Sequence, residues 1–347
     1  MAGRRLRASD IIFGGIHIGP SDSNQSMGAW GRTATQEAAT LVVRAALETG
    51  IRDFDTAPMY GNGAAEERLG ASIAGVGPTL AESARITTKT GRLVRSADLE
   101  PEERTLVADY SGHGARLSHQ ESLHRMGLQR IFSLRVHDCD GAGAPPTADN
   151  SDAVLAPDDG HLAALRELRA AGHVEEISLG MNSHVGFGRG PRYILRLLQE
   201  APKGTFDTAL LAGGWNLLCH EGWEVLAECA RHGIRVHVAG VFGGTGQSDN
   251  RNIFAPDVRW QPVADAWAQL GKQYDVTLAQ LAIAFATLPR AVSQVVLGMA
   301  TADEVKSNVR AIEHVRQVPM AVWHAAAARG LLPTDLLTGL VEEGSLG

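Results

Sequence analysis

The sequence predicts an α/β protein of the (β/α)₈ class, a TIM barrel, from three observations. Eight short apolar runs rich in β-branched residues alternate with longer segments at helical spacing, which indicates a parallel sheet. The alternative is an open doubly wound sheet, but the first run lacks the GxGxxG spacing that a dinucleotide-binding sheet of that kind carries. No linker or low-complexity segment divides the chain, so we expect residues 1–347 to form a single domain.

The eight runs are predicted to be strands because each is short, apolar and bounded by turn-forming or polar residues. They are Ile11–Ile16, Ile51–Asp55, Ala84–Lys89, Ile131–His137, Val174–Gly180, Thr205–Leu211, Ile234–Ala239 and Ser293–Gly298.

The segments between these runs are amphipathic and are predicted to be helices. They include Ala34–Thr49, Ala115–Met126, His161–Ala171, Arg192–Glu200, Trp223–Arg231 and Leu278–Thr287. Thr33 and Gln36 have the spacing of a capping box at the start of the first helix. Glycines stand where helices should end, at Gly50, Gly127, Gly172 and Gly233. Active-site loops are expected after strands one, four, six and seven. Residues 141–160 are interpreted as a surface excursion after strand four, and residues 243–259 as a further loop.

Composition is that of an ordinary globular protein, with 44% hydrophobic and 20% charged residues. The net charge of −7 does not suggest a surface for nucleic acid or anionic membrane, and no apolar run reaches transmembrane length. The chain has three cysteines and no CxxC, which argues against a disulfide framework and a thiolate metal site. This cysteine usage fits a reducing compartment, and we expect the protein to be cytoplasmic.

Polar side chains occupy the ends of successive predicted strands, where the active site of a barrel is built. Strand two ends in Asp55, and Tyr60 follows in the next loop. Strand three ends in Lys89 and strand four in His137. Packing alone gives no reason for polar groups at these positions, so we take these four residues as the candidate catalytic group.

The four residue types suit one chemistry. An ammonium such as Lys89 stabilises tyrosinate and lowers the pKa of Tyr60, and a carboxylate such as Asp55 keeps that ammonium charged. An imidazole such as His137 can orient a substrate oxygen. Only four of the 32 basic residues are lysine, so a lysine at a strand end suggests that a compact ammonium is needed there.

The run from Phe54 to Gly70 (FDTAPMYGNGAAEERLG) closely resembles the signature of the aldo-keto reductases. Thr88-Lys89 resembles the family's strand-three lysine, Val136-His137-Asp138 its strand-four histidine, and the similarity spans roughly residues 8–315. The resemblance implies a (β/α)₈ barrel that binds NAD(P) across the strand ends, with Tyr60 as general acid in reduction and base in oxidation. Within the family, the sequence resembles in particular the branch of aldose, fucose and pyridoxal dehydrogenases. The residues that carry this likeness are Asp109-Tyr110-Ser111, Arg135-Val136-His137-Asp138, Gly180-Met181-Asn182 and Ala239-Gly240-Val241-Phe242.

The resemblance also implies cofactor contacts, with departures from the family pattern. Where many members hold the nicotinamide amide with Ser-Asn, this chain has Asn182-Ser183, so Asn182 is the first choice and Ser183 the second. Phe242 is a substitute for the usual stacking tyrosine, and Gly243 and Gly244 could let the chain approach the pyrophosphate or simply form a flexible loop.

The adenosine end predicts the choice of cofactor. Members that prefer NADP place Lys and Arg after strand eight, and here Gly298 and Glu304 stand at those positions. A carboxylate would repel the 2′-phosphate and could bond ribose hydroxyls, so we expect NAD to be preferred over NADP. Asn308 matches a position that contacts adenine.

Substrate contacts are expected from loops, at Trp30, Trp215 and His220, while His161, His173, His232, His314 and His324 are interpreted as surface residues. No metal is expected. The leading hypothesis is a dehydrogenase that acts on a sugar hemiacetal or similar alcohol. The alternatives are an NADPH-dependent reductase of aldehydes or ketones, and a cofactor-sensing regulatory subunit on the same barrel.

Overall fold

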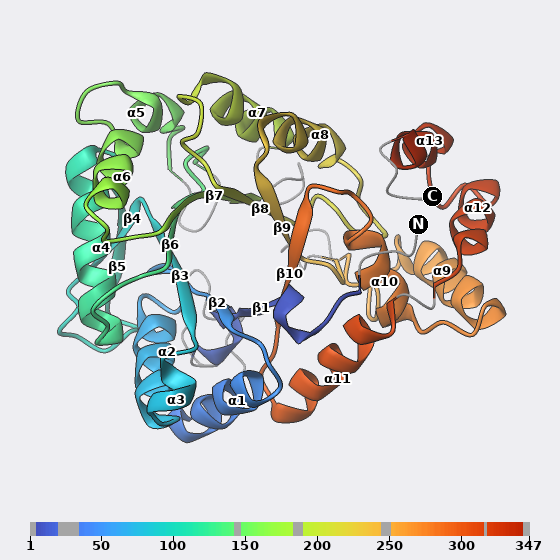
Figure 1. Cartoon of the computed structure of the whole chain (residues 1–347), viewed down its shortest axis with the longest axis horizontal. Coiled ribbons are helices and arrows are strands. Elements are labelled where there is room, and N and C mark those ends of the chain that lie inside the picture. The colour runs from blue at the N-terminus through green and yellow to red at the C-terminus, as the bar shows by residue number, and fades with distance from the viewer. Residues whose placement is uncertain are drawn as a thin grey trace.

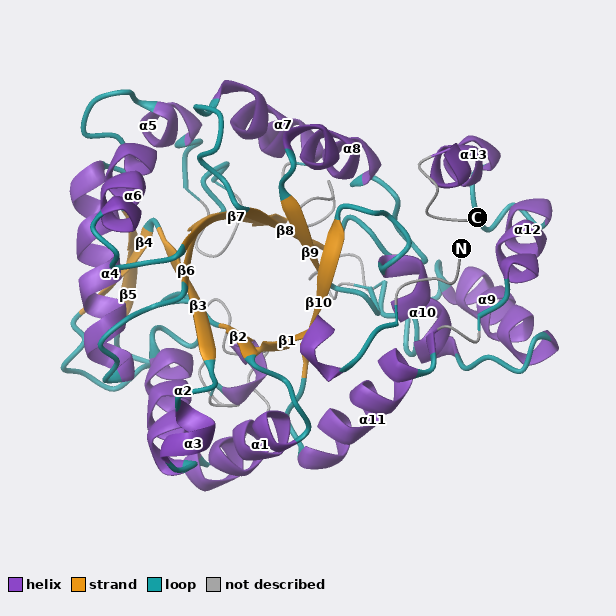
Figure 2. Cartoon of the chain, in the orientation of Figure 1, coloured by secondary structure: helices purple, strands orange, loops and turns teal. Residues whose placement is uncertain are grey.

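The computed structural model describes residues 5–19, 35–141, 147–182, 190–243, 251–315 and 318–342. Eight parallel strands close into a barrel in the order β1-β10-β9-β8-β7-β6-β3-β2 (Figures 1 and 2). They are β1 (Ile11–Gly14), β2 (Asp53–Asp55), β3 (Arg85–Thr90), β6 (Ser133–His137), β7 (Glu176–Asn182), β8 (Thr208–Ala212), β9 (Arg235–Ala239) and β10 (Val292–Gly298). Each predicted strand overlaps one of these, so the (β/α)₈ fold is confirmed.

Helices surround the barrel on its outside (Figure 2). They are α1 (Gln36–Glu48), α2 (Ala64–Gly75), α3 (Pro78–Ala81), α4 (Gly112–Met126), α5 (Ser151–Leu155), α6 (His161–Ala170), α7 (Pro191–Glu200), α8 (Trp223–His232), α9 (Gln261–Gln273), α10 (Leu278–Ala286), α11 (Ala302–Glu313), α12 (Met320–Ala328) and α13 (Thr334–Glu342). Of the last two, α12 packs against α9 and α13 packs against α12, both outside the ring (Figure 1). Single-turn 3₁₀ segments flank β1 at Ala8–Asp10 and Gly15–Ile18.

An antiparallel pair that the sequence analysis missed follows β3 directly. It consists of β4 (Arg92–Arg95) and β5 (Thr105–Ala108), which form a separate two-stranded sheet outside the barrel.

Helix ends follow the sequence signals with one correction. Gly127 and Gly233 end α4 and α8 in the left-handed conformation, which a residue without Cβ adopts at little cost. The N-cap of α1 is Thr35, whose hydroxyl accepts from the Ala38 N–H, and Gln36 is the first helical residue. The predicted capping box of Thr33 with Gln36 is therefore wrong, and Thr33 itself lies outside the described residues.

Strand register brings the expected polar residues into the barrel. Asp55 pairs with Thr87 across β2 and β3, and Lys89 pairs with Arg135 across β3 and β6. Because side chains alternate along a strand, Asp55, Lys89, Arg135 and His137 all point to the same, inner side. TIM barrels usually fill this space with branched apolar side chains, whereas here charged groups occupy it.

Three further observations concern the described part of the chain as a whole. Cys139, Cys219 and Cys229 are buried and free of disulfides. None of the described helices combines the length and apolar character that crossing a bilayer requires. That residues 1–347 form a single domain stays a prediction.

Candidate active site

Asp55, Lys89 and Tyr60 are joined at the C-terminal mouth of the barrel. The Lys89 ammonium donates to a carboxylate oxygen of Asp55, to the carbonyl oxygen of Thr56 at 2.9 Å and to the Tyr60 hydroxyl oxygen at 3.0 Å. Lys89 and Asp55 are buried, while Tyr60 is half-buried in the loop that follows β2. All three donor positions of the ammonium are thus used, which fixes its charge beside the tyrosine oxygen.

The electrostatic balance at this point keeps Lys89 charged. Burial alone would lower the pKa of Lys89, but the Asp55 carboxylate and the Tyr60 hydroxyl outweigh it, and the pKa is raised. Burial raises the pKa of Tyr60, and the neighbouring Lys89 opposes that effect. At neutral pH the ligand-free site therefore holds a protonated tyrosine next to a fixed positive charge.

His137 ends β6 beside Tyr60. The two rings lie edge to face, with centroids 6.0 Å apart. Burial, followed by the nearby cations Lys89, Arg92 and Arg135, holds the pKa of His137 well below its usual range, so the imidazole is neutral. The buried Nδ1 has no hydrogen-bond partner. A neutral imidazole beside the ring of a tyrosine is suited to orient a substrate oxygen.

Asp138, directly after His137, is a site residue whose role the sequence analysis did not anticipate. Its φ of 40° is left-handed, a conformation that Asp tolerates better than most residues. Asp138 accepts from the backbone N–H of Asn182 and, with both carboxylate oxygens, from its amide nitrogen, each at 3.3 Å. Burial and the neighbouring Asp140 raise the pKa of Asp138 to about 7. Asp138 thus orients the amide that was predicted to hold the nicotinamide.

A second missed residue, Arg135, contacts the other oxygen of Asp55. Its Nε donates to Asp55 at 2.8 Å, and its terminal nitrogens donate to Ser178 and His237. The signal was present in the sequence, because Arg135 has the same strand parity as His137 and must face the same side of β6.

Phe242 and Gly243, which were predicted to contact the nicotinamide and the pyrophosphate, lie after β9. Phe242 is half-buried, and its ring packs 5.3 Å from that of Phe254, centroid to centroid. Gly243 has a φ of 89°, and a Cβ there would meet the carbonyl oxygen of Arg251. The glycine is therefore required by the path of the loop itself. Gly244 and Ser183 lie outside the described residues.

At the adenosine end, Gly298 closes β10 against His17. A Cβ at position 298 would lie 2.1 Å from the His17 ring, so the imidazole occupies the space of a side chain there. Glu304 lies in the first turn of α11, and its carboxylate accepts from the Ala300 N–H at 2.8 Å. Asn308 follows on the same helix, half-buried, one turn after Glu304.

Trp215, predicted as a substrate contact, is fully buried. Its ring stacks on Phe285 of α10 and on Trp223 of α8, with centroids 4.7 Å and 5.6 Å away. This placement gives Trp215 a packing role between the strands and the outer helices, and its expected part in substrate binding stays a prediction.

His220 lies beside Trp215, 5.3 Å from the Phe285 ring, and burial lowers its pKa to about 4. Its part in substrate binding stays a prediction, and Trp30 is outside the described residues. One histidine expected at the surface is in fact buried. His161 contacts the Thr90 hydroxyl at 2.7 Å and the Ser111 carbonyl at 3.2 Å, whereas His173, His232, His314 and His324 are exposed.

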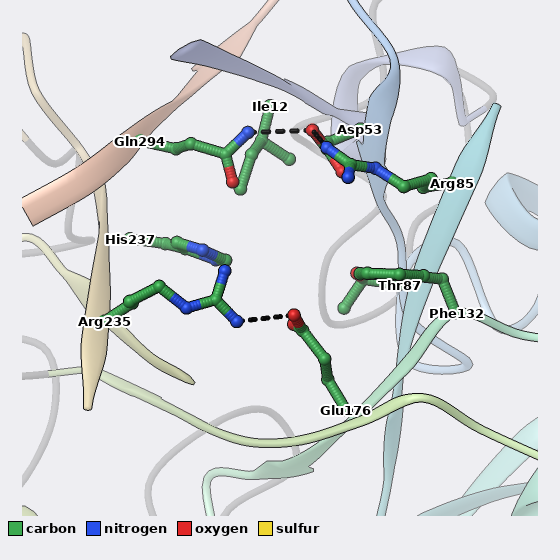
Figure 3. Close-up of a pocket in the computed structure, with 9 residues that line it drawn as sticks. All are labelled: Ile12, Asp53, Arg85, Thr87, Phe132, Glu176, Arg235, His237 and Gln294. Atoms are coloured by element: carbon green, nitrogen blue, oxygen red, sulfur yellow. Dashed lines mark hydrogen bonds and ion pairs between the residues drawn. The ribbon is translucent and has the colours of Figure 1, made fainter. Parts of the chain in front are cut away.

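A small hollow lies at the opposite, N-terminal mouth of the barrel (Figure 3). Its charged residues form ion pairs, Arg85 of β3 with Asp53 of the neighbouring β2, and Arg235 of β9 with Glu176 of β7, two strands away. In TIM barrels this end serves stability, and catalysis uses the other end. Among the described residues, no group of three or more His, Cys, Asp or Glu side chains could hold a metal ion.

Comparison with known proteins gives consistent findings. The Aldo/keto reductase family matches residues 10–322. The chain is 30% identical over 328 residues to pyridoxal 4-dehydrogenase of Microbacterium luteolum, which covers 85% of this chain and 88% of the relative. It is also 30% identical over 325 residues to D-threo-aldose 1-dehydrogenase of a Pseudomonas species, covering 87% and 91%. The solved glycerol dehydrogenase of Gluconobacter oxydans has the same fold, with a TM-score of 0.64, 17% identity and 95% of each chain covered.

Proposed function

This chain belongs to the aldo/keto reductase family and is an oxidoreductase acting between alcohol and carbonyl groups, and from that premise we propose that it oxidises a sugar hemiacetal or a similar alcohol with a nicotinamide cofactor. The observation that carries the proposal is the Lys89 ammonium, which lies between the Asp55 carboxylate and the Tyr60 hydroxyl at the C-terminal mouth. The names of the two curated relatives support an alcohol or hemiacetal of a polar small molecule as substrate.

In the proposed mechanism Tyr60 moves the proton. The nicotinamide cofactor, when bound, supplies or accepts the hydride. In oxidation the Tyr60 oxygen takes the proton of the substrate hydroxyl, and in reduction it returns a proton to the carbonyl oxygen. Lys89 stabilises the tyrosinate, Asp55 holds Lys89, and the neutral His137 orients the substrate oxygen.

The residues at the mouth fit a nicotinamide cofactor. Because Asp138 binds the amide nitrogen of Asn182, the Asn182 amide oxygen is the atom suited to accept from the nicotinamide carboxamide. Phe242 offers a partly exposed ring for stacking, with Gly243 following it. Ser183 and Gly244 remain predicted contacts.

We favour NAD over NADP because of the start of α11. Asp303 and Glu304 already place two carboxylates in its first turn, where a phosphate would otherwise be favoured. A 2′-phosphate near Gly298 and Glu304 would meet this negative charge, while ribose hydroxyls could donate to it. Asn308 is the proposed adenine contact. The three buried thiols support a reducing compartment, and we take the cytoplasm as its location.

Two measurements test the proposal. Tyr60→Phe should bind the cofactor with unchanged affinity yet lose most turnover, and near-normal turnover would refute the role of Tyr60. A panel of aldoses, pyridoxal and simple aldehydes, followed at the absorbance of the reduced nicotinamide with both cofactors, tests substrate class and preference. Faster reduction of aldehydes with NADPH would favour a carbonyl reductase, and tight cofactor binding without turnover would favour a regulatory subunit.

A further inference from the structure

Arg135 is a buried cation that the catalytic group described above does not use. Its side chain is fully buried inside the barrel. Its Nε donates to the second carboxylate oxygen of Asp55 at 2.8 Å, and its terminal nitrogens donate to the Ser178 hydroxyl at 2.5 Å and to His237 Nδ1 at 2.7 Å. A guanidinium stays charged at any pH a protein tolerates, so this position carries a permanent positive charge.

Asp55 therefore serves two cations. One oxygen binds the Lys89 ammonium, and the other binds the Arg135 guanidinium. One carboxylate carries one negative charge and cannot neutralise both groups. The trio of Lys89, Asp55 and Arg135 thus has a net positive charge, and its outermost cation, Lys89, contacts the Tyr60 oxygen.

We propose that Arg135 is a positioning residue that shares Asp55 with Lys89, leaves the Lys89 charge only partly neutralised, and so biases Tyr60 toward the ionised form that accepts the substrate proton in oxidation. The inference rests on the proposed function of Tyr60. It predicts that Arg135 extends to lower pH the range in which Tyr60 can accept the substrate proton.

The other charged groups around Tyr60 do not remove this bias. Asp138 is the remaining carboxylate that acts on Tyr60, and its pKa of about 7 leaves it only partly ionised near neutral pH. His137, on the adjacent strand end, is neutral. Arg92 adds a further buried positive charge, near His137 and Asp138.

The far side of Arg135 is held by neutral partners. Because a guanidinium can only donate, His237 Nδ1 must be the acceptor, and burial together with Arg135 holds the pKa of His237 well below its usual range. Ser178 in turn accepts from the Thr208 hydroxyl at 2.8 Å. His237 also lines the hollow at the N-terminal mouth (Figure 3). These neutral contacts hold the guanidinium in place but bring no second negative charge to it. Among these hydrogen-bond partners of Arg135, Asp55 is the only carboxylate.

The test is the pH dependence of kcat/KM for oxidation in full-length variants. Arg135→Met removes the charge, and Arg135→Gln removes it while it keeps a donor for Asp55. In both, the acidic limb should move upward by about one pH unit, a loss of about tenfold at neutral pH that disappears at high pH. Arg135→Lys keeps the charge and should leave the limb nearly in place. Ser178→Ala, which loosens the anchor but keeps the guanidinium, is the matched structural control.

The outcomes separate the two proposals. A limb that stays in place in a folded Met or Gln variant, or an equal loss at every pH, overturns the role of Arg135 while Tyr60→Phe still tests the proposed function on its own. Loss of the fold in both neutral variants, measured by thermal unfolding, also overturns it in favour of a purely structural role. An unshifted limb in Arg135→Lys together with a shifted limb in Arg135→Gln supports it.

Discussion

Replacing Lys89 by methionine should remove most oxidative turnover at neutral pH and leave the fold in place. The Lys89 nitrogen lies 3.0 Å from the Tyr60 oxygen. Two unit charges about 4 Å apart at an effective dielectric constant near 20 interact by about 4 kcal/mol, or about three pKa units. The half-buried Tyr60 ring retains some solvent, so we expect its pKa to rise by about two units and turnover to fall by about 100-fold.

Stability should change far less than activity in this variant. Removing one partner of a buried ion pair usually costs about 3–5 kcal/mol because a bare charge remains. Here Asp55 keeps Arg135 at 2.8 Å, so we expect a loss of at most about 2 kcal/mol. Methionine also preserves most of the side-chain volume of Lys89.

The assay compares rate with pH in Lys89→Met and in Lys203→Met, which makes the same substitution at an exposed site. The deficit of Lys89→Met should narrow as pH rises and tyrosinate forms without help, and Lys203→Met should match the unmodified protein. A rate within about threefold of the unmodified enzyme, or a deficit constant across pH, would refute the electrostatic role of Lys89.

Three further changes test other parts of the site. Glu304→Lys should raise the ratio of NADP to NAD catalytic efficiency at least about tenfold. It should also cost about 1 kcal/mol of stability, because the hydrogen bond from the Ala300 N–H and a favourable carboxylate in the first turn of α11 are both lost. Glu313→Lys at the other end of α11 is the control. Gly298→Ala should destabilise the fold by about 1–3 kcal/mol because its Cβ would meet His17, and added His17→Ala should restore stability in a denaturant titration; no recovery contradicts the clash. The folded pKa of Asp138, about 7, exceeds its ordinary 3.8, so its stability contribution is present at low pH and is lost as pH rises through 7. Asp138→Asn, which also tolerates the left-handed backbone, should flatten thermal stability between about pH 4 and 8, and an unchanged slope would count against burial as the cause.

The sequence predicted the barrel and the gathering of the candidate catalytic residues at its C-terminal mouth, because both depend on local patterns. Strand runs are readable from short apolar segments, and Asp55, Lys89 and His137 are polar residues at the ends of such runs. The same reasoning could have found Arg135, since alternation along β6 fixes the side it faces. It was overlooked because it lies inside a strand rather than at its end.

Other features depend on long-range packing that a single sequence does not reveal. The residues next to Trp215 in the sequence do not indicate that its ring packs against Phe285 of α10, 70 positions along the chain. His161 begins a helix, a position that is usually exposed, yet Thr90 and Ser111 from other elements cover it. The hydrogen bond from the Ala300 N–H to the Glu304 carboxylate could have been anticipated from the start of α11, but this carboxylate was interpreted only through its expected ligand.

The charged interior of the barrel also bears on how the chain reaches its native strand pairing. β2 is only three residues long, so its backbone ladder specifies alignment weakly. Its two acidic residues compensate, because Asp53 meets Arg85 at one mouth and Asp55 meets Lys89 and Arg135 at the other. A shift of β2 by one residue would turn both carboxylates outward and leave the buried cations Lys89 and Arg135 without the Asp55 counter-ion. We therefore expect Asp55 to help fix the register of β2 as the barrel closes, so that a substitution at this position would affect strand alignment as well as activity.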